Sequence, residues 1–293
     1  MEKTRCRAGG LILGSLIDTC SKVHDNARKS GMKESEGCWD RPSLNDMVPE
    51  AHLIVRYMLK TDEDFAQSVI DTVHAIWLRD KEQYPAGYQV FYGPTRLRPE
   101  LMVIGLNPGG GPTCFSDEKE SMASPDSPME YITSRNDRSY PLAGKTVTLF
   151  ESIGLLDMLA ASLKTNMSFF RSKRWAHLPQ QHSAECLRLV LEMIKTFRPK
   201  AILCESIRVF DLVYPRAVGT DHSSMIHIEK GQSDRRIYTS VTSEVSGEST
   251  ILIGITHLTG SRPSSADLDR IKQLLADDLG RTFASSRRAQ VRG

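Results

Sequence analysis

Residues 101 to 112 of this chain read LMVIGLNPGGGP, an apolar run that passes into a glycine-rich turn. Consecutive apolar residues of this kind are typical of a strand buried on both faces, as in a parallel sheet. Asn107 follows at the carboxyl end of that strand. In open α/β sheets ligands bind outside the carboxyl ends of the strands, and the glycines after Pro108 let backbone amides approach a ligand closely. The segment therefore predicts a binding site at Asn107, although a strand-to-helix turn without chemistry has the same pattern.

Two further predicted strands end in polar residues suited to chemistry. One runs into Asn166, and another, Thr250 to Thr256, runs into His257. Taken alone, an asparagine at a strand end usually satisfies a neighbouring turn, and a lone histidine is usually structural. Because parallel strands bring their carboxyl ends to one edge of a sheet, we expect Asn107, Asn166 and His257 to lie together.

The rest of the pattern indicates helices that alternate with strands. Apolar residues recur at helical spacing from Thr61, over Lys145 to Leu163, and ahead of Pro199, which precedes the short buried strand Ala201 to Cys204. This helix–strand unit implies a parallel sheet. A hairpin around Gly231 is expected to follow.

A last amphipathic helix is predicted to be capped by Ser264 and to end before Gly280. Thr113 to Leu142 is expected to be a long connection without regular structure, and loops of that length are usually functional or mobile. We predict an N-terminal extension, partly disordered, over residues 1–60, an α/β domain over 61–282, and a basic tail over 283–293.

Composition excludes several classes of protein. With 38 basic and 36 acidic residues, the net charge of +2 argues against a surface that is basic overall, so nucleic-acid binding requires local patches. The six cysteines include no C-x-x-C pair, which argues against zinc and iron–sulfur sites and favours reduced thiols in the cytoplasm. Arg5, Arg7 and the apolar stretch 11–17 imitate a secretory signal, but no small-residue cleavage site follows. No apolar run approaches the ~18 residues of a membrane span.

Two of these polar strand ends resemble motifs of a known family. Gly105-Leu106-Asn107-Pro108-Gly109 resembles the first motif of the uracil-DNA glycosylase superfamily, in the G-x-N-P-G form of its single-strand-selective and mismatch-specific branches. The segment 257–262, HLTGSR, resembles the second motif, although Leu258 stands where a proline is usual. Asn166 falls where several branches keep an asparagine that reads the pyrimidine. The resemblance covers about residues 90 to 280.

This resemblance implies a three-layer α/β/α sandwich with a central, mainly parallel four-stranded sheet. It implies a monofunctional DNA glycosylase that flips out a pyrimidine and hydrolyses its N-glycosidic bond, in base excision repair or in defence against foreign modified DNA. Asn107 would orient the water, and His257, when neutral, would donate to the pyrimidine O2. No metal or cofactor is needed, and we expect a monomer with DNA as its partner.

Further residues would hold the base and the DNA. The base-binding set would be Gly105, Leu106, Pro108, Gly109, Phe115 and Asn166. Phe115 would stack on the base, although an ordinary core phenylalanine is an equal interpretation. The DNA-binding set would be Arg171, Lys173, Arg174, Thr259, Gly260, Ser261 and Arg262, although the basic run 171–174 could equally be a solvated turn.

Substrate range and competing functions complete the expectations. In the strictly uracil-specific branch a tyrosine follows the first-motif proline and blocks pyrimidine C5, whereas this chain has Gly109. We therefore predict tolerance of 5-substituted pyrimidines. The missing proline and the lack of an acidic water activator leave a catalytically inactive nucleic-acid-binding protein as the alternative. A dinucleotide site is disfavoured because the turn lacks the G-x-G-x-x-G spacing.

Overall fold

The computed structural model describes residues 62–95, 98–109, 119–120, 126–172, 175, 178–218, 225–245, 247–261 and 263–290. All of them belong to the unit Val55–Gly293. The predicted extension over residues 1–60 lies outside the described residues, as do four predicted site residues, Phe115, Lys173, Arg174 and Arg262.

The centre of this unit is a mixed sheet in the order β2-β1-β3-β6-β5-β4. The parallel strands are β1 (Leu101–Gly105), β2 (Leu163–Asn166), β3 (Ala201–Cys204) and β6 (Glu248–Ile255). The antiparallel pair β4 (His227–Lys230) and β5 (Arg236–Val245) extends the sheet beyond β6. The α/β class is confirmed, but the prediction of four strands is wrong, because the hairpin expected around Gly231 pairs with β6 and makes the sheet six-stranded.

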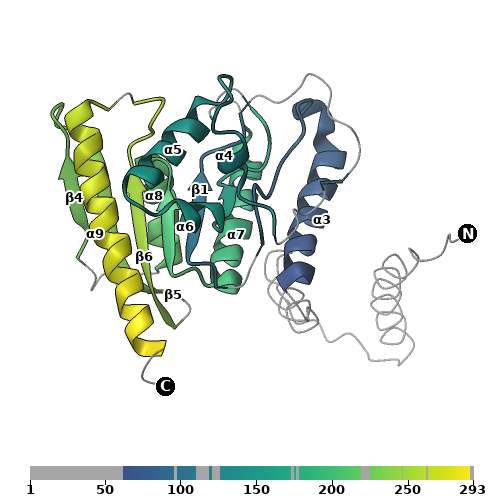
Figure 1. Ribbon diagram of the computed structural model, residues 1–293. Coiled ribbons are helices and arrows are strands. Elements are labelled where there is room, and N and C mark those ends of the chain that lie inside the picture. Colours follow the sequence, from purple (N-terminus) through teal and green to yellow (C-terminus); the bar gives the residue numbers. More distant parts are fainter. Residues whose placement is uncertain are drawn as a thin grey trace, which may run out of the picture. The chain divides into compact units, whose positions relative to one another are not determined.

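Helices pack on both faces of the sheet (Figure 1). One core lies between the strands and α3 (Asp62–Asp80), α7 (Gln180–Phe197) and α8 (Ile207–Ala217). The opposite core lies between the strands and α5 (Pro141–Ser152), α6 (Leu156–Ala160) and α9 (Ser265–Gln290). Successive strand residues enter opposite cores, as the period of two requires, so that Met102 and Ile104 face one core while Leu101 and Val103 face the other.

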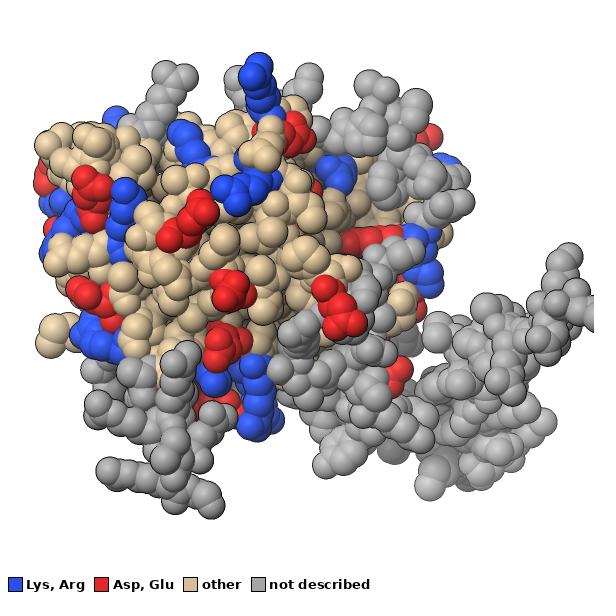
Figure 2. Space-filling model, viewed as in Figure 1, with Lys and Arg blue, Asp and Glu red and all other residues tan. Residues whose placement is uncertain are grey.

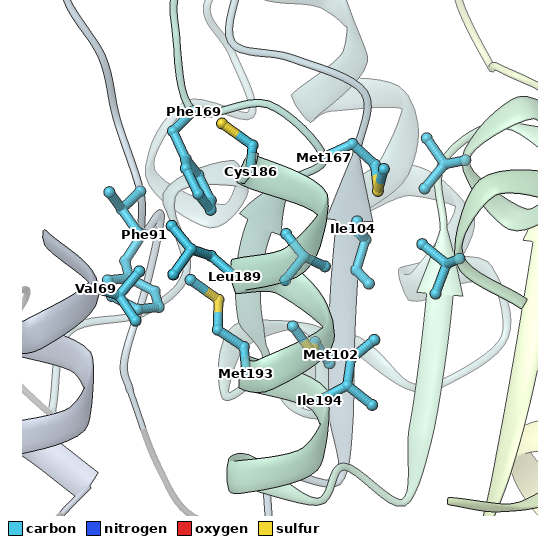
Figure 3. Packing of buried hydrophobic residues seen from close by; sticks show 14 of the residues in the cluster. Val69, Phe91, Met102, Ile104, Met167, Phe169, Cys186, Leu189, Met193 and Ile194 are labelled. Carbon is cyan, nitrogen blue, oxygen red and sulfur yellow. The ribbon is translucent and has the colours of Figure 1, made fainter. Parts of the chain in front are cut away.

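The core on the α7 side is apolar throughout the region drawn in Figure 3. Ile194 of α7 lies beside Met102 and Ile104 of β1 there. Leu189 and Met193 of α7 point to the other side of the helix, toward Phe91 and toward Val69 of α3. Cys186 and Cys204 are buried free thiols of this core. This face holds the helices and the sheet together by burial of apolar surface.

Two helix boundaries differ from the sequence-based expectation. The helix expected over Lys145 to Leu163 is in fact α5 and α6, separated at Gly154, whose φ of +71° is a conformation that glycine adopts without strain. Gly280 does not end the last helix but lies inside α9, which continues into the predicted basic tail as far as Gln290. A glycine inside a helix costs only about 1 kcal/mol, so it is not a sufficient stop signal.

The connection expected to lack regular structure also needs correction. It contains α4 (Glu130–Thr133), and α5 starts within it at Pro141. A further short element, the 3-10 helix η1 (Lys81–Gln83), follows α3. Within the described residues, no helix combines the length and the apolar character needed to cross a membrane.

Candidate functional site

A cavity of about 590 Å³ opens at the carboxyl edge of the parallel strands, on the face covered by α4 and the start of α5. Its volume lies in the range that proteins use for drug-sized ligands, about 300 to 1,000 Å³. Every parallel strand contributes to its wall. The lining residues are Gln89, Tyr92, Gly105, Leu106, Asn107, Pro108, Gly109, Glu130, Tyr131, Asp137, Ser139, Tyr140, Pro141, Leu142, Asn166, Arg171, Ser172, Glu205, His257 and Thr259.

The prediction that three strand ends meet is confirmed, because Asn107, Asn166 and His257 all line this cavity. The structure adds Glu205, which follows β3 directly. Side chains alternate along a strand, so residues two positions apart lie on the same face. The face toward α5 therefore carries Lys164 with Asn166, Leu203 with Glu205, and Ile255 with His257.

Asn107 is held by the turn that follows β1. Its Nδ2 donates to the carbonyl oxygens of Pro108 and Ser172, each at 2.8 Å. The amide N–H groups of Met167 and Ser168 donate to the carbonyls of Gly105 and Leu106, which fixes the turn to the segment after β2. Both hydrogens of the Asn107 amide are thus used by the backbone, and its acceptor, Oδ1, is the group left for a ligand.

Gly105 allows two polar side chains to meet across β1. A Cβ added there would lie 2.2 Å from Asn166 Oδ1 and 3.0 Å from Glu205 Oε2. Asn166 pairs with Gly105 in the β1–β2 register, and its exposure is 4%. Any larger residue at position 105 would force Asn166 out of its place in the cavity wall.

His257 is oriented by the loop that follows β6. The Gly260 amide N–H donates to His257 Nδ1 at 2.9 Å, and Thr259 Oγ1 lies 3.1 Å from the same nitrogen. Because Nδ1 accepts, the neutral ring carries its proton on Nε2, which is then a donor. Burial lowers the pKa of His257, helped by Lys164 and Lys145 and opposed by Glu205. The ring is therefore neutral with a donating Nε2 at neutral pH, which is the state that the proposed chemistry requires.

Leu258, which stands where the resembling motif usually has a proline, is fixed by packing and by a hydrogen bond. Leu258 is 3% exposed and belongs to the core on the α5 side. Lys145 Nζ, from α5, donates to the Leu258 carbonyl at 2.9 Å. Side-chain burial and this hydrogen bond hold the backbone that a proline ring would otherwise restrict.

A buried ion pair contributes to the cavity wall. Lys164 Nζ donates to Glu205 Oε2 at 2.8 Å, and the two side chains are 1% and 4% exposed. Tyr131 Oη, from α4, donates to the same oxygen at 2.9 Å. Burial and the neighbouring Glu205 raise the pKa of Tyr131, so its hydroxyl keeps the proton that it donates. The ammonium of Lys164 also lies 4.5 Å from the centre of the Tyr131 ring, a cation–π distance.

Four buried polar atoms of the cavity have no hydrogen-bond partner among the described residues. In the described part of the chain, five buried side-chain atoms make no hydrogen bond, and the one outside this cavity is Thr146 Oγ1. The others are Tyr92 Oη, Glu130 Oε2, Arg171 Nε and Glu205 Oε1. Buried polar groups are usually paired, so a cluster of unpaired donors and acceptors in one cavity indicates a polar ligand.

Arg171 lies in this wall rather than on an open surface. It is half-buried and donates to Gln89 Oε1, while burial raises the pKa of the nearby Glu130 and Arg171 opposes that shift. The segment 88–92 that carries Gln89 and Tyr92 runs beside the end of β2, where the Tyr92 amide donates to the Lys164 carbonyl at 3.0 Å. Arg171 therefore faces whatever occupies the cavity.

A smaller cavity of about 280 Å³ shares His257 with the first. Arg208, Arg235 and Arg236 line it, together with Ser261 of the loop after His257. Arg236 forms an ion pair with Asp211. Ser261 and Thr259 thus lie on different cavities, and basic side chains border the one that holds Ser261.

Sequence reasoning missed Glu205, Lys164, Tyr131, Glu130 and Tyr92. A signal for Glu205 existed, because a carboxylate follows the buried run Ala201 to Cys204 just as Asn107 follows β1. Lys164 was also visible as a charge inside a short strand. Their pairing across 41 positions could be seen only in the fold.

The described residues offer no group of three or more His, Cys, Asp or Glu side chains arranged to hold a metal ion. Comparison with models of known protein families gave no match. A search among curated proteins gave none either.

Proposed function

We propose that this protein is a DNA glycosylase of the uracil-DNA glycosylase type, which hydrolyses the N-glycosidic bond of a flipped-out pyrimidine. The observation that carries the proposal is the pairing of Asn107 and His257 in one cavity with complementary hydrogen-bonding states. Asn107 presents an acceptor because both its N–H groups are used, and His257 presents a donor because its Nδ1 accepts from Gly260.

Hydrolysis needs these two functions. A water held by Asn107 Oδ1 attacks C1′ of the sugar, the electron pair of the breaking C1′–N bond passes to the base, and the proton that the water loses is finally taken up by the released base. Negative charge then develops on the base and is spread onto O2, where the Nε2 proton of His257 can stabilise it. A preorganised donor of this kind is worth about 10² to 10³ in rate.

The size and polarity of the cavity support a substituted pyrimidine. Gly109 lines the cavity, and a Cβ added to it would meet no atom within 4 Å. Beyond the strand ends, the wall offers the unpaired groups of Tyr92, Glu130 and Arg171. A polar substituent at C5 would satisfy donors and acceptors that an unsubstituted base leaves unpaired.

The charge distribution bears on how DNA would be held. On the face drawn in Figure 2, basic and acidic side chains of the described residues are interspersed, without a large basic area. The arginines of the smaller cavity lie beside His257 instead. They support a mode in which the DNA backbone crosses the strand-end edge next to the flipped nucleotide.

The test is an abasic-site assay on single-stranded DNA that contains uracil or 5-substituted pyrimidines. Asn107→Ala and His257→Ala should each lower cleavage by about 10²-fold or more, because each removes a group that acts in the transition state. His227→Ala is the matched control, since His227 is exposed on β4 and should leave the rate unchanged.

Thermal unfolding of each variant should stay close to that of the wild type. Wild-type turnover in Asn107→Ala or His257→Ala would contradict the assignment. DNA binding without abasic sites on any substrate would favour the inactive binding protein.

A further inference from the structure

Glu205 is the buried charged group of the cavity that the proposed mechanism does not use. Its Oε2 accepts from Lys164 Nζ and Tyr131 Oη, whereas its Oε1 has no partner among the described residues and is buried in the cavity wall. A carboxylate held in an ion pair has acceptors only, so Oε1 can be satisfied solely by an N–H or O–H donor. Leaving such an atom unpaired is costly, which indicates that a ligand supplies the donor.

The carboxylate of Glu205 lies beside Asn166, the asparagine expected to read the base. Glu205 Oε2 and Asn166 Oδ1 both lie within 3.0 Å of the Cβ position at Gly105, so the two side chains converge over β1. β3, which Glu205 directly follows, lies between β1 and β6, the strands that precede Asn107 and His257. A base held between Asn107 and His257 would therefore present its pairing edge to Asn166 and Glu205 together.

The two kinds of pyrimidine differ in what that edge offers. Uracil presents a carbonyl acceptor at position 4 and an N–H at position 3, and cytosine presents an amino group at position 4 and an acceptor at position 3. An asparagine can pair with either, because its amide can be rotated. A carboxylate acceptor that faces position 4 removes this ambiguity, since the cytosine amino group has hydrogens for both side chains while the uracil carbonyl would face an anionic oxygen.

We propose that Glu205 is a specificity-determining residue that makes the cavity select pyrimidines with a 4-amino group, cytosine and its 5-substituted derivatives, over their 4-oxo counterparts. Lys164 and Tyr131 are positioning residues that hold Oε2 and so aim Oε1 at the base. This inference rests on the proposed function. Base selection can also be measured as a difference in binding affinity, without turnover.

The experiment uses the full chain and two single-stranded oligonucleotides that differ at one base, 5-hydroxymethylcytosine or 5-hydroxymethyluracil. Abasic-site formation should favour the amino base by about tenfold or more in kcat/KM, because a site built around a hydrogen bond rejects the analogue that lacks it. Glu205→Gln should abolish or invert that ratio, since its amide can donate to a 4-oxo group. Glu244→Gln, an exposed residue of β5, is the matched control and should keep the ratio.

A binding measurement separates this proposal from the proposed function. Asn107→Ala protein should bind the amino oligonucleotide more tightly than the oxo oligonucleotide by about the same factor. That result together with no abasic sites from the wild type would support the selection by Glu205 and refute glycosylase activity.

Equal or tighter binding of the oxo base by the wild type would overturn the role of Glu205, whatever the activity. The wild-type ratio decides this even if loss of the partner of Lys164 prevents Glu205→Gln from folding. A folded Glu205→Gln with an unchanged ratio would overturn it as well.

Discussion

The same parallel strands present two different faces. Toward α7, β1 and β3 are apolar up to their carboxyl ends, where Ile104 and Cys204 are both fully buried, and Figure 3 shows Ile104 in this core. Toward α5, β1, β3 and β6 are also apolar, but β2 places Lys164 there, and Glu205 and His257 follow β3 and β6. Because residues alternate, polar side chains can line the cavity on one face of the strands while the opposite face stays apolar. The face toward α5 therefore contains a buried ion pair and several buried polar atoms without a partner among the described residues.

Removal of one member of the ion pair should have the largest effect on stability. Lys164→Met leaves Glu205 as an unpaired buried carboxylate, which should lower the free energy of unfolding by about 3 to 5 kcal/mol. Lys164→Met combined with Glu205→Leu should recover most of that loss, because no buried charge then remains. Urea unfolding of both variants measures the difference.

The control for this prediction is Lys230→Met. Lys230 and Asp234 form an exposed pair, with side chains 59% and 84% accessible, so its loss should cost well under about 1 kcal/mol. A similar small cost for Lys164→Met would show that the polar face does not carry a tightly coupled charge pair.

A smaller effect is expected from Gly109→Tyr, which tests whether the cavity beside Gly109 admits a base with a substituent at C5. The backbone accepts a side chain at Gly109, and a tyrosine there would occupy the space beside pyrimidine C5. Cleavage of 5-substituted bases should fall by about tenfold or more, while an unsubstituted base is spared. Gly280→Tyr, on α9 and with equally open space around its Cβ position, is the control.

If Gly109→Tyr leaves the substrate range unchanged, another part of the wall must shape the pocket. The residues from Glu130 to Leu142 are then the first to examine, because α4 and the start of α5 line the same cavity.

The smallest effect concerns pH. Burial lowers the pKa of His257 from its ordinary value of 6.5, so the neutral form is favoured on folding. The neutral His257 ring therefore contributes fully to stability, and acts as a hydrogen-bond donor, above about pH 6.5. Both effects are lost as the pH falls through the lowered pKa. Activity should therefore be flat above that pH and decline on the acid side, which a kcat profile between about pH 5 and 8 will measure.

Glu120 provides the control for the pH profile. Burial raises the pKa of Glu120 to about 7, so this carboxyl also titrates in the measured range. Glu120→Gln should leave the acid-side decline in place. If the decline disappears in that variant, His257 is not the group that controls it.

The sequence predicted the elements whose signals are local. The runs at Leu101, Ala201 and Thr250 are apolar enough to indicate buried strands, and the polar residues after β1, β2 and β6 indicated the binding edge. The hairpin around Gly231 was predicted, but the count of four strands, which the family resemblance implied, left it out, and β4 joins the sheet only through β5. Its membership depends on pairing between distant segments, which local periodicity does not contain.

The candidate site could likewise be predicted only in part from the sequence. Asn107 and His257 could be found because each follows a strand. The partners of Glu205 could not be found, because Tyr131 and Lys164 reach it from two other elements, one of them a helix inside a segment expected to be irregular. Hydrogen bonds across the fold, rather than spacing along the chain, define the polar wall of the cavity.

The most direct test of glycosylase activity is the detection of released free base. Wild-type protein would be incubated with single-stranded DNAs that contain uracil, 5-hydroxymethyluracil or 5-hydroxymethylcytosine, and with hypermodified phage genomes, and the soluble products identified by mass spectrometry. A free pyrimidine base released in equal amount with abasic sites, and lost in Asn107→Ala, is the predicted result. Binding of these DNAs without release of any base would contradict the account.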